Sequence, residues 1–416
     1  MRPRGNVVLF IAALSAVVLG TYAAQWLSVP ASWQRGSDFS ASYVAAQLWR
    51  DGQGDQLYNQ TLEAQRHAAI NSPGFVTDLP FITPPLTAVL AAPLTPLNPQ
   101  AAYHAAAVIE VLLLVAAAVV ASRAAPWPPG TGLGQRPLMT VAALASVATL
   151  AVALLAQWDG VCAVAVATAY AMWRRGRPGW AGFALAFGIC LVKPHLGVGL
   201  AAFLIGRRDR HAVAGAAGAI ALEGTASLVL VGPAASRAWF GALALSLGHS
   251  PPASTQGVSG FFASWLGWGP VTVVLATIAA VAAVGACAVL GARSRTAPRL
   301  LEPALGGAVA LSLLAAPHLL GHDLALLIPV FVWLVAAATA ADAAGGGRWP
   351  GRGAGRLLVG WAAFNVVALL DLGNGAPAPP GRLVPIALAA AGVAAWRQTG
   401  LRTAPGATRP AELNAG

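Results

Sequence analysis

Hydrophobic and polar positions along this chain alternate in long blocks. A helix needs roughly 20 apolar residues to cross a bilayer core about 30 Å thick, and fewer where it is broken or packed inside a bundle. The blocks predict an all-α polytopic membrane protein with about 12 transmembrane helices, within a range of roughly 10–13. The apolar runs cover approximately residues 6–28, 102–122, 137–156, 160–173, 179–192, 196–206, 212–232, 268–291, 303–316, 324–341, 356–372 and 383–396.

Arginine clusters between the runs predict the orientation of the chain. Loops on the cytoplasmic side of a membrane are enriched in Arg and Lys. With twelve crossings, all the clusters fall on one side, and both the N- and the C-terminus are then cytoplasmic. The clusters are Arg2 and Arg4, Arg123 and Arg136, Arg174 to Arg177, Arg207 to Arg210, Arg293 to Arg299, Arg348 to Arg356, and Arg397.

Two longer segments fall on the opposite side of this predicted membrane. We expect a single integral-membrane domain over residues 1–396, with a partly helical first extracytoplasmic segment at 29–101 and a second at 233–265. The first segment includes helical patterning, and the stretch from Pro80 to Leu94 predicts an interfacial helix of about four turns. Residues 397–416 are expected to form a disordered cytoplasmic tail.

Composition supports the membrane assignment and excludes other classes. Hydrophobic residues make up 57% of the 416 residues and charged ones only 9%, whereas soluble domains carry about 25% charged residues. The net charge of +11 lies in the loop clusters, so it does not indicate nucleic-acid binding. Cys162, Cys190 and Cys287 lie in apolar runs without ligand spacing, which favours core packing over a disulfide or a metal.

The stretch Gly36-Ser37-Asp38-Phe39-Ser40-Ala41-Ser42-Tyr43 follows the first apolar run. It places one carboxylate at a membrane surface beside hydroxyls and an aromatic ring. Asp38 is our candidate for a catalytic base, with Ser37, Tyr43 and Tyr58 as contacts for an acceptor or as supports of this segment.

Lys193 is the single lysine of the chain and lies between two apolar runs, followed by Pro194 and His195. An ionisable group at membrane depth indicates function, because its desolvation is costly unless it is paired or hydrated. We expect Lys193 to bind an anionic leaving group such as a lipid phosphate, with His195 beside it. The alternative is a lysine at a helix end that extends to the lipid headgroups.

His318, His322 and Asp323 form a second polar group near the end of an apolar run. Two histidines four residues apart would share one face of a helix. The two histidines could act as a pair of zinc ligands, but no third ligand is evident. We therefore expect no metal. Two interpretations remain open. In one, His318 and His322 bind the donor, and Asp323 contacts a substrate hydroxyl or supports the loop. In the other, the two histidines are a structural pair at the interface.

Gln157-Trp158-Asp159-Gly160 forms a turn between two apolar runs, and either a polar hairpin or donor binding explains it. A base and a cluster of cations together fit group transfer at a membrane face. The chain lacks a glycine-rich phosphate loop and a nucleotide fingerprint, which favours a lipid-linked sugar over a nucleotide sugar as donor. No cofactor is expected.

These residues together resemble glycosyltransferase family 87. The resemblance rests on Gly36-Ser37-Asp38-Phe39, Tyr43, Gly52, Leu57-Tyr58, Thr83-Pro84-Pro85-Leu86, Ala92-Pro93-Leu94, Gln157, Arg174 to Arg177, Gly182, Lys193-Pro194, Pro317-His318 and His322-Asp323. The chain departs from the family pattern at Gln157-Trp158-Asp159, where Gly before the glutamine and Asn after it would be expected.

The resemblance implies a fold of the C superfamily of glycosyltransferases in a bacterial cytoplasmic membrane. It also implies a polyprenyl-phosphate sugar donor, typically mannose, an extracytoplasmic glycolipid or glycan acceptor, and inversion at the anomeric carbon. Asp38 then corresponds to the family's base, and His322, or less directly His318, to its late histidine.

A transporter or a flippase for lipid-linked sugars is the alternative from another class. Twelve helices and a buried lysine would also suit it, but transporters usually show repeated halves, and here the polar groups gather on one side. A scaffolding membrane protein would not explain that clustering.

Overall fold

The computed structural model describes residues 3–71, 79–132, 134–249, 255–346, 351–373 and 383–401, and these residues form helices and no strands. Arg2 and Arg348 of the predicted clusters and residues 402–416 of the predicted tail lie outside the described residues. The helices long and apolar enough to cross a membrane lie in α1 (Pro3–Leu27), α6 (Pro99–Ala124), α12 (Arg210–Leu230), α15 (Pro270–Thr296), η6 with α17 (His322–Leu326 and Leu327–Ala344), and α18 (Arg352–Gly373).

A seventh span is formed if α7 (Gln135–Leu144) and α8 (Val147–Leu155), which meet at a bend of 57°, cross together. The protein is therefore an all-α polytopic membrane protein. Within the described residues, length and composition support six or seven spans, so the predicted count of twelve is not confirmed.

The difference arises because several apolar runs form short helices. These helices have 16, 13, 10 and 15 residues, and at 1.5 Å per residue they are about 15–24 Å long. Their bounds are α9 (Asp159–Arg174), α10 (Pro178–Cys190), α11 (Val198–Arg207) and α16 (Leu301–Ala315).

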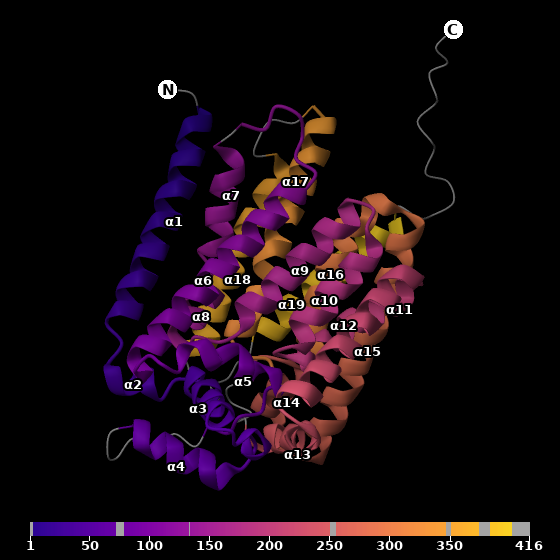
Figure 1. Cartoon of the computed structure of the whole chain (residues 1–416). Helices are drawn as coiled ribbons and strands as arrows, with labels where there is room; N and C mark the ends of the chain where they lie inside the picture. Colours follow the sequence, from indigo (N-terminus) through magenta and orange to yellow (C-terminus); the bar gives the residue numbers. More distant parts are fainter. Residues whose placement is uncertain are drawn as a thin grey trace.

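The segment at 29–101 is helical in part, as predicted, and gathers at one end of the bundle together with α13 and α14 (Figure 1). Its predicted four-turn helix is wrong: α5 has six residues and is followed by the short η2. Pro84 and Pro85 delay its start, and Pro93 supplies no backbone N–H to continue it. The elements at this end are α2 (Ala31–Arg35), α3 (Phe39–Arg50), η1 (Gly54–Gln56), α4 (Gln60–Ile70), α5 (Leu86–Ala91), η2 (Ala92–Leu94), α13 (Pro233–His249) and α14 (Val258–Leu266).

The last helix that the structure describes, α19 (Val384–Leu401), continues past the predicted boundary at residue 396. Residues 397–401 are therefore helical rather than part of a disordered tail. Arg293 lies over the ring of Trp396, with its Cζ 4.1 Å from the ring centroid, and it donates a hydrogen bond to the Trp396 carbonyl. These contacts tie the end of α19 to α15.

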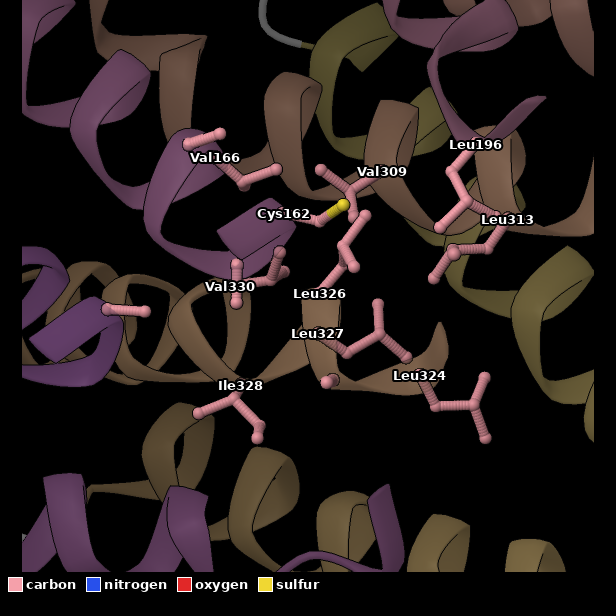
Figure 2. Packing of buried hydrophobic residues seen from close by; sticks show 14 of the residues in the cluster. Cys162, Val166, Leu196, Val309, Leu313, Leu324, Leu326, Leu327, Ile328 and Val330 are labelled. Atoms are coloured by element: carbon pink, nitrogen blue, oxygen red, sulfur yellow. The ribbon is translucent and has the colours of Figure 1, made fainter. Parts of the chain in front are cut away.

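Small residues let the helices pack closely, as is usual inside membranes. Gly182 lies against the backbone of Ala212, and Gly206 against that of Ala288, with no room for a Cβ at either glycine. Apolar side chains from α9, α16, the loop helix η3 (Pro194–Gly197) and the start of α17 meet in the centre of the bundle (Figure 2). Three of the polar residues described next, Asp159, Lys193 and His322, lie at or just before the starts of α9, η3 and α17.

Candidate active site

Four chain segments converge where regular helix is interrupted. Asp38 precedes α3, and Gln157 to Asp159 join α8 to α9. Ala156 ends α8 in the left-handed conformation with φ 51°. Pro194 follows Lys193 in the connection after α10. The fourth segment is η6, which begins with His322 and Asp323. Breaks of this kind free side chains and backbone groups inside a membrane bundle.

Lys193 is the centre of a buried ion-pair cluster. Its Nζ donates to Oδ1 and Oδ2 of Asp159 at 2.9 and 3.0 Å and to Oδ1 of Asp323 at 2.7 Å. Lys193 is 5% exposed, and both aspartates are fully buried. Burial opposes the charge of this lysine, but the two carboxylates outweigh it and raise the Lys193 pKa, so the side chain is a cation.

These contacts differ from both sequence-based interpretations of Lys193. The side chain points into the bundle rather than to the headgroups, which makes the snorkelling alternative wrong. Its ammonium is hydrogen-bonded to protein carboxylates, so in this arrangement it orients neighbouring groups rather than facing an open site.

Asp38 is the accessible carboxylate beside this cluster. Its side chain is 27% exposed, compared with 0% for Asp159 and 1% for Asp323. Nε2 of Gln157 donates to Oδ2 of Asp38 at 2.9 Å. Asp38 and Gln157, which the sequence singled out separately, are thus brought together, with one carboxylate oxygen held and the group still open to a substrate.

His322 connects Asp38 to the cluster. Its Nδ1 lies 2.9 Å from Oδ2 of Asp159 and 3.3 Å from Oδ1 of Asp323, while its Nε2 lies 3.9 Å from Oδ2 of Asp38. The same Nδ1 lies 3.0 Å from Nζ of Lys193, so this ring nitrogen is held between the lysine and the two carboxylates. Nε2 is buried and has no hydrogen-bond partner among the described residues.

His318 does not share a helical face with His322, contrary to the sequence-based expectation. Residues 316–321 are not helical, because Pro317 and Gly321 interrupt the path from α16 to η6. The His318 ring instead stacks on His195, with centroids 4.5 Å apart. Burial lowers the pKa of both rings, which lie in connections between helices, so both are neutral at pH 7.

The residues expected to support the first segment make internal contacts. Oη of Tyr43 donates to the Leu97 carbonyl at 2.8 Å, and Oη of Tyr58 donates to that of Thr83 at 2.7 Å. Oγ of Ser37 donates to the Gln34 carbonyl. These three contacts hold the segment that carries Asp38.

Two acidic residues near the site were not predicted as site residues. Asp159 was seen only as part of a turn, yet it contacts both Lys193 and His322. Glu110, on α6, accepts a hydrogen bond from the Gly160 N–H at 2.7 Å and so fixes the start of α9. The signal that could have found Asp159 was the need of a lone buried lysine for a carboxylate at similar membrane depth.

Asp159, His322 and Asp323 could in principle hold a metal, since one ligand atom from each lies within 4.8 Å of the others. Their donor types suit zinc. However, Nζ of Lys193 lies 2.7–3.0 Å from atoms of all three. An ammonium in that position competes with a metal ion, so the donor set as arranged fits a lysine better.

The protein is a bundle of membrane-spanning helices, and an accessible carboxylate lies beside its buried ion-pair cluster. These features define a polytopic membrane protein with a polar site suited to group transfer. The chain belongs to glycosyltransferase family 87, whose model matches residues 81–317, and it is therefore a membrane glycosyltransferase. Gln157, Asp159, Lys193 and His195 lie within the matched range, Asp38 precedes it, and His322 follows it. Comparisons with curated proteins and with solved structures gave no match.

Proposed function

We propose that this chain moves a hexose, most simply mannose, from a polyprenyl-phosphate donor to an extracytoplasmic glycolipid or glycan acceptor. The observation that carries this proposal is the geometry of Asp38, an accessible carboxylate 2.9 Å from Gln157 and 3.9 Å from Nε2 of His322. Family membership supports the transferase activity, and the membrane location supports a lipid-linked donor.

Asp38 acts in this proposal as the general base. The acceptor hydroxyl oxygen attacks the anomeric carbon while its proton passes to the Asp38 carboxylate. The bond from that carbon to the phosphate oxygen breaks, and polyprenyl phosphate leaves with the electron pair. A single displacement inverts the configuration, so a β-linked donor gives an α-glycoside. Gln157 keeps the carboxylate oriented for this step.

His322 is the proposed contact for the donor. Asp159, Asp323 and Lys193 together carry one net negative charge, which a protonated His322 would balance. Its Nε2 would then donate to a phosphate oxygen and stabilise the charge that develops there. The neutral His195 and His318 pair is proposed to line the donor side of the site, and Lys193 to hold Asp159 and Asp323 in place.

The proposal also includes a membrane orientation. The structure has an arginine end, which we define as the end of the bundle where α9 finishes at Arg174, α11 finishes at Arg207 and α15 has Arg293 in its last turn. Asp159 and Arg174, the first and last residues of α9, lie about 22 Å apart along the helix axis. We propose that the arginine end is cytoplasmic in a bacterial inner membrane, that the short helices complete twelve crossings, and that the site faces outward.

The test is sugar transfer by proteoliposomes that contain the purified protein. They receive radiolabelled polyprenyl-phosphate mannose and a mixed pool of lipid acceptors, with the Asp38→Asn variant alongside. A labelled glycolipid from the wild type alone is the expected result, and its structure identifies the acceptor. An intact donor and no product with mannose or any other polyprenyl-phosphate hexose would contradict the proposal. Movement of the donor across the bilayer without a product would support a flippase.

A further inference from the structure

A long cavity lies between the last helices of the chain. Its volume is about 960 Å³, at the upper end of the roughly 300–1,000 Å³ of small-molecule sites. The lining comes from α16, α17, α18 and α19, and most of it is aliphatic or aromatic carbon. Along α17 the lining runs from Leu327 to Asp342, a distance of about 22 Å at 1.5 Å per residue. That length approaches the thickness of a bilayer core.

The cavity exists because the outer helices pack on different partners. The ring of Trp361 on α18 stacks on that of Phe331 on α17, with the ring centroids 4.7 Å apart. Gly307 of α16 lies against Ala395 of α19. A groove is left between the two pairs. Gly360 lines it, is exposed, and would place a Cβ in open space with no atom within 4 Å.

The two ends of the cavity differ in exposure and charge. Leu327, at the end nearer the candidate active site, is buried. The other end lies at the arginine end and is lined by Arg174, Arg299 and Arg356, of which the last two are exposed. The basic end of the cavity is therefore accessible from outside the bundle.

Two acidic residues also line the basic end, but both already have partners. Glu302 lies 3.4 Å from Arg174 and accepts from Oη of Tyr170 at 3.0 Å. Asp342 accepts from the backbone N–H groups at the start of α18, Gly353 among them at 3.0 Å. Within the described part of the chain, Arg299 and Arg356 have no ion-pair partner.

We propose that this cavity binds an anionic phospholipid from the membrane leaflet at the arginine end. An acyl chain lies along α17, and the lipid phosphate is held by Arg299 and Arg356. Guanidinium groups bind phosphate oxygens in a forked, charge-assisted geometry. The apolar lining provides the surface against which the acyl chain packs. The site is separate from the proposed transfer reaction and does not depend on it.

The proposal is tested by measuring bound lipid rather than activity. The full-length protein is placed in nanodiscs of phosphatidylglycerol or phosphatidylcholine, extracted in mild detergent, and examined by native mass spectrometry for lipid retained per protein. Loss of charge-assisted hydrogen bonds in the Arg299→Gln/Arg356→Gln variant should weaken phosphatidylglycerol retention about tenfold. Gly360→Phe, which fills the cavity, should do the same.

Gly355→Phe is the matched control, because Gly355 lies on the same helix, has open space around its Cβ position, and does not line the cavity. It should retain as much phosphatidylglycerol as the wild type. Unchanged retention in both cavity variants, or equal retention of phosphatidylcholine, would overturn the proposal. So would lipid that enters only after residues 402–416 are deleted, because the chain's own end would then be the occupant.

Discussion

The side-chain amide of Gln157 donates a hydrogen bond to the carboxylate of Asp38 at 2.9 Å, across 119 positions of sequence. The bond joins the start of α3 to the junction of α8 and α9. It occupies one oxygen of Asp38 and leaves the group 27% exposed. A base that is oriented but open is the arrangement that proton removal from a bound hydroxyl requires.

Asp38→Asn should therefore abolish sugar transfer. General bases contribute about 10²–10⁴-fold to rates, so a fall of at least about 100-fold is expected, while the amide remains able to hydrogen-bond and the protein still folds. Transfer rates and size-exclusion profiles measure the two effects. Asp55→Asn, an exposed carboxylate on the same segment, is the control. Retention of more than a few per cent of activity would remove Asp38 from the role.

Lys193→Met should reduce the yield of folded protein sharply. It leaves Asp159 and Asp323 buried without their cation, and breaking a buried ion pair costs about 3–5 kcal/mol. Neutralising the partners as well, in Lys193→Met/Asp159→Asn/Asp323→Asn, should restore much of the stability, because no unpaired charge remains. Thermal unfolding in detergent compares the two variants. Equal stability of the single variant and the wild type would contradict the ion-pair role.

Gly160→Ala should destabilise the start of α9. A Cβ there would lie 2.6 Å from the backbone oxygen of Glu110 and 2.7 Å from its Oε2, closer than real Cβ contacts. Relief of that clash moves Asp159, so transfer should fall together with the melting temperature. Gly224→Ala on α12 is the control, since its Cβ position is open and alanine favours a helix. Melting temperatures that fall equally in both variants would argue against a specific fit at Gly160.

Acidification should lower stability through the stacked histidines. Burial holds the pKa of His195 and His318 below the ordinary value of about 6.5. Between these pKa values, the two histidines bind protons in the unfolded chain but not in the folded one. Their contribution to stability is therefore complete above about pH 6.5 and declines as the pH falls toward their pKa values in the folded protein. His195→Gln/His318→Gln should lose less thermal stability than the wild type between pH 7 and pH 5. The exposed His211→Gln should lose as much as the wild type.

Sequence reasoning reached the class of protein because hydrophobic blocks and arginine placement are local properties. It also selected Asp38, Gln157 and His322, which the structure brings together. These residues were recognisable because each is polar beside an apolar run, where a polar group indicates function.

Other features were missed because they depend on how helix ends meet. The partners of Lys193 are Asp159 and Asp323. These two residues are far apart in the sequence, and each lies close to an apolar run. The face shared by His318 and His322 was inferred from helical spacing, which Pro317 and Gly321 remove. The predicted twelve spans are not confirmed by length and composition, because periodicity does not show whether a short apolar run is a complete crossing.

The burial of Lys193 has a practical consequence for chemical labelling. It is the single lysine of the chain and is 5% exposed, so amine-reactive reagents have one side-chain target, and that target is protected while the ion pairs hold. Modification of this position would report the opening of the cluster itself. Labelling of the Lys193 side chain by a common amine-reactive reagent thus reports on the cluster without any engineered cysteine.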